Sequence, residues 1–169
     1  MYSKLKTLLI CIALAAVTLS GCGKTSSPSP EEYDVEEVRC VFNYGDQDGA
    51  ELDIFKADGT VTQYIITPYS DSGIDMFAGE IPSDSECEKK ESTISGDEWE
   101  TIVAAVKDSD FFSLPEELPK VEAYDGSTCY IEIVTTAGNH RSGGYCAGNG
   151  SGKEHERFYS VRSLLRLDR

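Results

Sequence analysis

Cysteine is the residue type in this sequence whose positions point most directly to chemistry. The chain has six cysteines. Cys11 lies inside an apolar run near the N-terminus, whereas Cys22 follows the small residues Ser20 and Gly21. A thiolate is a soft nucleophile that is readily alkylated, and small neighbours leave Cys22 accessible to a modifying enzyme.

Residues 1–21 have the three parts of an export signal. Lys4 and Lys6 supply a positive start, and an apolar run of about 12 residues follows them. A membrane-spanning helix needs roughly 20 apolar residues, so a removable signal peptide is favoured over a transmembrane anchor. The end of this signal, Leu19-Ser20-Gly21-Cys22, resembles the lipobox of bacterial lipoproteins.

The resemblance to bacterial lipoproteins implies a lipid on Cys22. In that family the cysteine carries a thioether-linked diacylglycerol, and the chain is cleaved before it. Two acyl chains provide stable attachment, which would place the protein on the extracytoplasmic side of a cell membrane or outer membrane. The alternative is a secreted protein with a chance cysteine. Residues 22–37 are predicted to be a lipidated, disordered linker, because small, proline and acidic residues cannot bury apolar surface.

Four cysteines remain in the exported part of the chain. They are Cys40, Cys87, Cys129 and Cys146. An even number favours two disulfides, for which three pairings are possible, and the absence of pairs two or three residues apart argues against a zinc ribbon. A hairpin turn centred between Ala137 and Gly138 would place Cys129 opposite Cys146, which would leave Cys40 to pair with Cys87. A turn one residue later would separate Cys129 from Cys146.

The charge balance excludes one class of partner. The chain has 15 basic and 30 acidic residues and a net charge of −15. The signal contains lysines but no acidic residue, so the mature protein is more acidic still. Neutralising nucleic-acid phosphates needs a basic surface, and we therefore expect no nucleic-acid partner. Charge would also repel an anionic membrane, so the lipid on Cys22 has to provide the attachment.

Short apolar patterns predict the regular elements of the exported part. Residues 38–44, 50–57, 60–67, 87–94, 128–136 and 140–147 are predicted to be strands. Asp58-Gly59 predicts a type I′ hairpin turn between two of them. The charged residues Lys89, Lys90 and Glu91 are typical of an edge strand that avoids further pairing.

Two capping boxes predict the helices. Ser95 with Glu98 opens a helix that ends near residue 107, and Ser151 with Glu154 opens a second one. Trp99 belongs to an apolar stripe on the first helix and is predicted to lie in the core. We expect a single α+β domain over residues 38–169, with an antiparallel meander sheet of about five to six strands and two helices packed on one face.

Residues 68–86 interrupt this regularity with scattered proline, glycine and acidic residues. A loop this long inside a compact domain is usually functional or mobile. We single out Tyr69, Asp71, Asp75 and Phe77 as candidates for a binding surface. The alternative is a loop whose aromatic side chains fold back onto the core.

Segments that resemble metal- and nucleotide-binding motifs lack the residues or spacing that these motifs require. The turn at residues 45–49 has the glycine of a calcium-binding EF-hand loop, but Tyr44 and Phe55 stand where oxygen ligands are required. His155-Glu156 lacks the second histidine of a zinc peptidase motif, and residues 148–154 lack the glycine spacing of a phosphate-binding loop. We therefore expect no metal, no cofactor and no catalytic residues.

Residues 38–167 loosely resemble small secreted domains of unknown function in bacterial lipoproteins. The motifs that carry the resemblance are Asp58-Gly59, Ile94-Ser95, Phe111-Phe112-Ser113-Leu114-Pro115 and Asp125-Gly126. It implies no activity. We expect a membrane-anchored binding or inhibitory module whose ligand is a protein or another envelope component. The alternative is a small extracytoplasmic hydrolase or cation-dependent enzyme, because acidic catalytic pairs come from distant positions.

Overall fold

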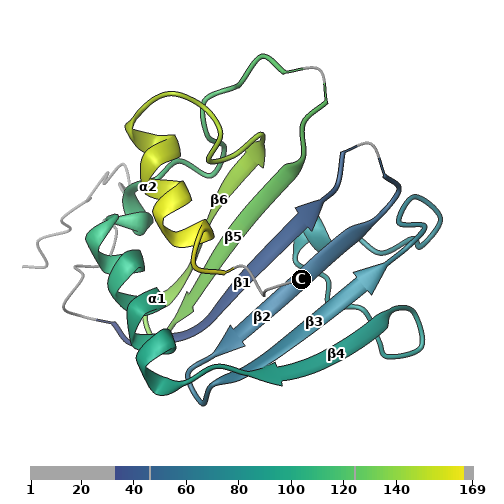
Figure 1. Cartoon of the computed structure of the whole chain (residues 1–169), viewed down its shortest axis with the longest axis horizontal. Coiled ribbons are helices and arrows are strands. Elements are labelled where there is room, and N and C mark those ends of the chain that lie inside the picture. Colours follow the sequence, from purple (N-terminus) through teal and green to yellow (C-terminus); the bar gives the residue numbers. More distant parts are fainter. Residues whose placement is uncertain (1–32, 46, 124, 166–169) are drawn as a thin grey trace, which may run out of the picture.

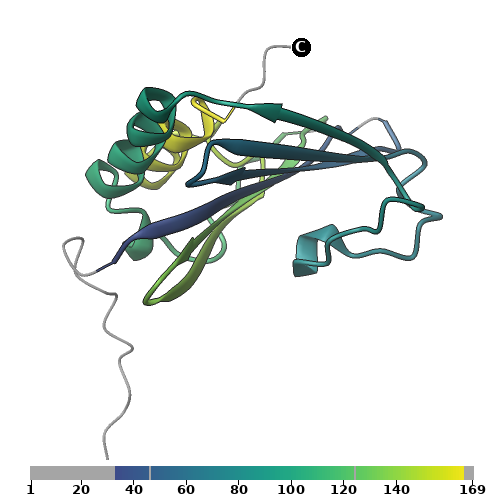
Figure 2. The same cartoon turned by 90° about the horizontal axis from the view of Figure 1, so that it is seen from below.

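A computed structural model describes residues 33–165 except positions 46 and 124. The strands are β1 (Val35–Asn43), β2 (Ala50–Lys56), β3 (Thr60–Ile66), β4 (Glu88–Thr93), β5 (Thr128–Thr135) and β6 (Gly138–Tyr145). The helices are α1 (Gly96–Asp108), α2 (Lys153–Arg162) and the 3₁₀ helices η1 (Met76–Ala78) and η2 (Phe111–Ser113). The predicted fold class is confirmed, since an antiparallel sheet carries both α-helices on one face (Figures 1 and 2).

The strands form one sheet in the order β4-β3-β2-β1-β5-β6, and every neighbouring pair is antiparallel. The chain meanders from β1 to β4, passes through α1 and η2, and then adds the β5-β6 hairpin to the free side of β1 (Figure 1). All six residues of β4 are exposed. The predicted edge strand is therefore confirmed.

The folded part begins earlier than predicted. β1 starts at Val35, and the buried side chain of Tyr33 lies 4.6 Å from the ring of Phe112, centre to centre. Residues 33–37 thus belong to the domain and not to the linker predicted for 22–37. Tyr33 and Val35 lie among acidic residues, but Tyr33 packs against Phe112 of η2 and Val35 pairs with Thr135 of β5. These contacts extend the folded part beyond the start predicted from the sequence.

The turn between β2 and β3 lies where it was predicted, but its geometry differs. Gly59 has a φ of 84°, whereas Asp58 has a negative φ. A type I′ turn needs positive φ at both central residues, so the type I′ turn predicted from Asp58-Gly59 is wrong. The Asp58 carboxylate instead accepts a hydrogen bond from the Thr60 amide at 2.9 Å, which is the usual role of aspartate in a turn.

The turn between β5 and β6 falls earlier than predicted. Thr135 pairs with Gly138, so Thr136 and Ala137 form the loop. Cys129 consequently faces Gly144, and Cys146 lies beyond the end of β6. The predicted placement of Cys129 opposite Cys146 is therefore wrong. The Thr135 hydroxyl accepts from the Ala137 amide at 3.2 Å, a local contact that favours the earlier turn.

The two α-helices begin differently. At the start of α1, Ser95 Oγ accepts from the Glu98 amide at 3.2 Å and the Glu98 carboxylate accepts from the Ser95 amide at 2.7 Å, so this capping box is confirmed. The box predicted for Ser151 is wrong, because the N-cap of α2 is Gly152 and has no side-chain cap bond.

The main core lies between the sheet and the two helices. The buried side chains of α1 and α2 that form it are Trp99, Ile102, Val106, His155, Phe158 and Val161. They pack against fully buried residues of the sheet such as Val38, Phe55, Ile131 and Ile133. The predicted placement of Trp99 in the core is confirmed.

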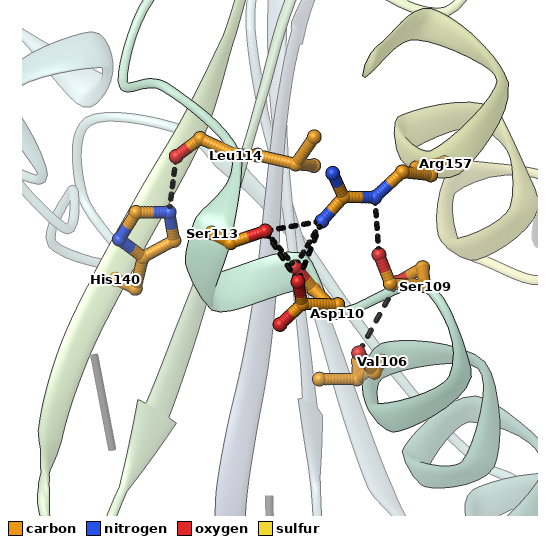
Figure 3. Close-up of polar contacts among 7 residues, drawn as sticks. All are labelled: Val106, Ser109, Asp110, Ser113, Leu114, His140 and Arg157. Carbon is orange, nitrogen blue, oxygen red and sulfur yellow. Dashed lines mark hydrogen bonds and ion pairs between the residues drawn. The ribbon is translucent and has the colours of Figure 1, made fainter. Parts of the chain in front are cut away.

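Arg157 of α2 holds the end of α1 (Figure 3). Its guanidinium donates to the carbonyl oxygens of Ser109 and Asp110 and, at 2.6 Å, to the hydroxyl of Ser113. Asp110 has a φ of 48°, so the chain turns sharply between α1 and η2. The last carbonyls of a helix have no hydrogen-bond partner within it. Arg157 therefore provides hydrogen-bond donors for the carbonyls at the C-terminal end of α1.

The segment after η2 is fastened to β6 and α2. His140 Nε2 donates to the Leu114 carbonyl at 3.0 Å, and the Ser142 hydroxyl donates to the Pro115 carbonyl at 2.8 Å. The Pro119 carbonyl accepts from His155 Nε2 at 2.9 Å. Both histidines therefore act as donors to backbone carbonyls.

Candidate binding cleft

The face of the sheet opposite the helices has its own small core. Its buried residues are Val41, Ala50, Leu52, Ile54, Ile66 and Met76. Residues 68–86, including η1, cover part of this face (Figure 2). Met76 is 2% exposed, so its side chain is the main anchor of this segment.

The covering segment is also fastened at its start. The Asp48 carboxylate, in the turn between β1 and β2, accepts from the Ser70 amide at 2.7 Å and from the Ser70 hydroxyl at 2.5 Å. The Asp48 carbonyl accepts from the Tyr69 amide at 3.1 Å. The bonds from Ser70 lower the pKa of Asp48 below its ordinary value. These contacts hold the segment at a defined position over the sheet.

The four residues predicted as a binding surface divide into two pairs. Tyr69 and Phe77 are half-buried against the second core, and their ring centres lie 6.0 Å apart. Asp71 and Asp75 are exposed. The Asp75 carboxylate accepts from the Ala78 amide at 2.9 Å and caps η1. The aromatic pair thus folds back onto the sheet, and the four side chains do not form one continuous exposed surface.

A small open cleft lies between this segment and the sheet. It is lined by Arg39, Val41, Leu52, Met76, Gly79, Ile81, Tyr130, Glu132 and Arg141. The apolar side chains of Val41 and Leu52 belong to the sheet, and Ile81, which is 47% exposed, lies on the opposite side. The cleft is therefore apolar in its middle and bounded by charged groups.

The two arginines of the cleft differ in their ion pairs. Arg39 lies 2.8 Å from the Glu37 carboxylate and 3.2 Å from the Glu132 carboxylate. Arg141 is the cross-strand neighbour of Glu132, yet it forms no ion pair or hydrogen bond within the described part of the chain. Its guanidinium carbon lies 4.0 Å from the centre of the Tyr130 ring. Its donors are thus available to a ligand, while a cation–π contact holds the group in place.

Tyr130 is fixed from three sides. Its hydroxyl donates to Glu117 Oε1 at 2.5 Å, the Phe77 ring packs against it in a T-shaped arrangement with the centres 6.0 Å apart, and the Arg141 guanidinium lies over the ring. Burial and the hydrogen bond to the Glu117 carboxylate raise the pKa of Tyr130 to about 12. The hydroxyl therefore stays protonated at neutral pH and acts as a donor. Tyr130 serves as a rigid platform and not as a base.

A buried acidic pair lies on the helix side of the sheet and was not predicted. Glu51 and Asp53 are 2% and 4% exposed. Gln63 Nε2 donates to Glu51 Oε1 at 2.6 Å and to Asp53 Oδ1 at 3.1 Å, and the Tyr44 hydroxyl donates to Glu51. The sequence signal is the position of both acids on the same side of β2 as Phe55. This pair is enclosed and does not contribute to the cleft.

The predicted disulfide between Cys40 and Cys87 does not fit the fold. Cys40 belongs to the main core and Cys87 packs against the second core. The two residues thus lie on opposite faces of the sheet, with β2 and β3 between β1 and β4. All four described cysteines are free thiols, and Cys40 Sγ lies 3.8 Å from Cys129 Sγ. The order of the cysteines in the sequence does not reveal on which face of the sheet each one lies.

Other kinds of site receive no support from the described residues. Among residues 33–165, positions 46 and 124 apart, no group of three or more His, Cys, Asp or Glu side chains could hold a metal ion. No helix in this same part of the chain is long and apolar enough to span a membrane. Cys22 and the predicted signal peptide lie outside the described residues.

Comparison with known proteins adds no assignment. The chain matches no family model, no curated protein and no solved structure. Function must therefore be argued from the site itself.

Proposed function

We propose that this chain is a membrane-tethered extracytoplasmic binding module whose ligand enters the cleft between residues 68–86 and the sheet. The tether is the lipid on Cys22 that the lipobox resemblance implies. The domain would then be presented on the outer side of a membrane, where it captures a protein ligand.

The observation that carries this proposal is Arg141. A guanidinium with five donors stands beside an apolar cleft without an ion-pair partner in the described chain, although the protein has a net charge of −15. Acidic side chains are abundant enough to neutralise every arginine. An unpaired guanidinium beside this cleft therefore favours an anionic or carbonyl group of a ligand.

The shape of the cleft indicates the rest of the ligand. Val41, Leu52 and Met76 form an apolar surface, and Ile81 extends it outward. An apolar side chain that packs on this surface is removed from water, and this burial favours binding. We therefore propose that the ligand is a protein segment with an apolar side chain next to a carboxylate.

A capture experiment tests the site. The full chain carrying Cys22→Ser, which cannot be lipidated, is immobilised and exposed to the envelope fraction of the parent cell, and the bound proteins are identified by mass spectrometry. We expect one protein to be captured by this chain and by its Tyr159→Asp control, and to be lost from the Ile81→Asp and Arg141→Glu variants. Equal capture by all four would overturn the proposed site.

A separate experiment tests the tether. The wild-type chain and its Cys22→Ser variant are expressed in the parent cell, and membrane and soluble fractions are compared. We expect the wild type in the membrane fraction, with the mass of a diacylglycerol added to Cys22, and the variant in the soluble fraction. An unmodified Cys22 would contradict lipid attachment and leave the cleft proposal to its own test.

A further inference from the structure

Two sulfur atoms meet on the helix side of the sheet, beneath α2. Cys40 lies on β1 and Cys129 on the neighbouring strand β5. In the register of these strands, Cys40 faces Ile131 and Cys129 faces Phe42. The two cysteines are thus diagonal neighbours, and both side chains point to the helix side, with 3.8 Å between the sulfur atoms.

We propose that Cys40 and Cys129 form a disulfide in the exported protein and that Cys87 and Cys146 remain thiols. The proposal gives the domain one cross-link, between the neighbouring strands β1 and β5. It differs from the two disulfides that the count of cysteines suggested.

The positions of the other two cysteines exclude a second cross-link. Cys87 directly precedes β4, and Cys146 directly follows β6, the two edge strands of the sheet. Five strand spacings of about 4.8 Å each separate these edges, roughly 24 Å. A disulfide needs two Cα atoms within about 7 Å. Cys87 and Cys146 therefore cannot pair with each other.

Cys146 lies beyond the end of β6, and its sulfur atom forms no hydrogen bond or disulfide with Cys129 in the described part of the chain. Its amide donates to the Ser127 carbonyl at 2.8 Å, and it has a φ of 56°. Its sulfur atom lies beside Gly126, where a side chain at position 126 would collide with it. The partner within reach of Cys129 is therefore Cys40.

The surroundings of the pair favour thiol–disulfide exchange. The hydrogen bond from Cys40 and the positive charge of Arg162 lower the pKa of Cys129, while the same hydrogen bond and burial raise the pKa of Cys40. The Arg162 guanidinium lies 5.2 Å from the centre of the Phe42 ring and donates to the Ala147 carbonyl at 2.9 Å. Arg162 is thus held close to the pair, where it stabilises a thiolate on Cys129.

The reaction needs an oxidant, and an exported protein meets small disulfides and thiol oxidoreductases outside the cytoplasm. Cys40, 8% exposed against 0% for Cys129, loses its proton and bonds to one sulfur of the oxidant, whose second sulfur leaves as a thiol. The Cys129 thiolate then attacks Cys40 Sγ and releases the first oxidant sulfur as a second thiol. Two protein thiols are oxidised, and one oxidant disulfide is reduced.

The test uses the full chain with Cys11→Ser and Cys22→Ser, so that only the four domain cysteines remain. The reduced protein is incubated with oxidised glutathione, denatured, treated with iodoacetamide and mapped by mass spectrometry. We expect a mass loss of about 2 Da, a cross-linked pair of peptides containing Cys40 and Cys129, and alkylation at Cys87 and Cys146. Alkylation of all four cysteines, or a link that includes Cys87 or Cys146, would overturn the proposal.

Two variants separate the cross-link from general folding effects. The Cys87→Ser/Cys146→Ser variant should keep the cross-link, and reduction should lower its Tm by several degrees. The Cys40→Ala/Cys129→Ala variant should give the same Tm with and without reductant. If reduction leaves the Tm of the first variant unchanged, the pair does not form a cross-link in the folded protein. Because the oxidation is carried out on purified protein, the result does not depend on lipid attachment.

Discussion

The guanidinium of Arg141 lies over the ring of Tyr130, with 4.0 Å between the guanidinium carbon and the ring centre. The ring itself is held in place, because its hydroxyl is bonded to Glu117 and it packs against the Phe77 ring. Arg141 is therefore positioned by stacking while its nitrogen atoms remain available. This arrangement is suited to receiving a ligand, since little side-chain entropy is lost when the group binds.

The covering segment should depend on Met76. Met76→Ala removes a side chain that is 2% exposed and should lower the free energy of unfolding by about 2 kcal/mol or more, because the core loses contacts and gains a cavity. The measurement is urea denaturation, with proteolysis within residues 68–86 as a local readout. Ile81→Ala, at a position that is 47% exposed, is the control and should change stability by less than about 0.5 kcal/mol. Equal effects of the two changes would show that the segment is not anchored at Met76.

The contact between the two α-helices should depend on Arg157. Arg157→Gln removes the donors to the Ser109 and Asp110 carbonyls and to the Ser113 hydroxyl. Lost hydrogen bonds from a charged group cost about 1.5–3 kcal/mol, so the Tm should fall by several degrees. Lys153→Gln, at an exposed position of the same helix, is the matched control and should leave the Tm unchanged. A wild-type Tm for Arg157→Gln would mean that packing alone holds α1.

Stability should decline in mildly acidic solution because of His140. Burial lowers the pKa of His140, against the opposing effects of the Leu114 carbonyl and Glu116. The folded state therefore favours the neutral ring, and the unfolded state binds the proton more readily. The contribution of this group is complete above the unfolded pKa of about 6.5 and is lost as the pH falls from there towards the folded pKa.

The measurement is the urea midpoint between pH 7.5 and pH 5 for the wild type and for His140→Gln. The difference between the two proteins isolates His140 from the carboxylates that titrate at lower pH. We expect the wild type to lose stability relative to the variant as the pH falls. A relative gain on acidification would contradict the assigned direction of the pKa shift.

Local signals in the sequence predicted the elements well. Ser95 with Glu98, the turn at Asp58-Gly59 and the charges of β4 each act within a few residues, and each element lies where it was predicted. The failures are small shifts in position. The Ser151 box and the β5-β6 turn were wrong by one or two residues, because several adjacent residues can serve as a cap or a turn and tertiary packing chooses among them.

The cleft could not be predicted from the sequence, since its walls come from distant positions. Arg39, Tyr130 and Arg141 lie on three strands, and Met76 lies in the covering segment. Residues 68–86, singled out from the sequence, contribute Met76, Gly79 and Ile81 to the cleft, whereas Tyr69 and Phe77 pack against the second core and anchor the segment. The unpaired state of Arg141 depends on Glu132 bonding to Arg39 instead, which no sequence pattern reveals.

The measurement that tests the central claim most directly is photo-cross-linking in the parent cell. A photoreactive amino acid replaces Ile81 at the cleft or Tyr159 on α2, both of which are nearly half exposed, in the otherwise wild-type chain and in the Arg141→Glu chain. We predict a protein adduct from position 81 that is absent from position 159 and lost with Arg141→Glu. An adduct that forms equally from position 159, or that persists undiminished in the Arg141→Glu chain, would contradict ligand binding in this cleft.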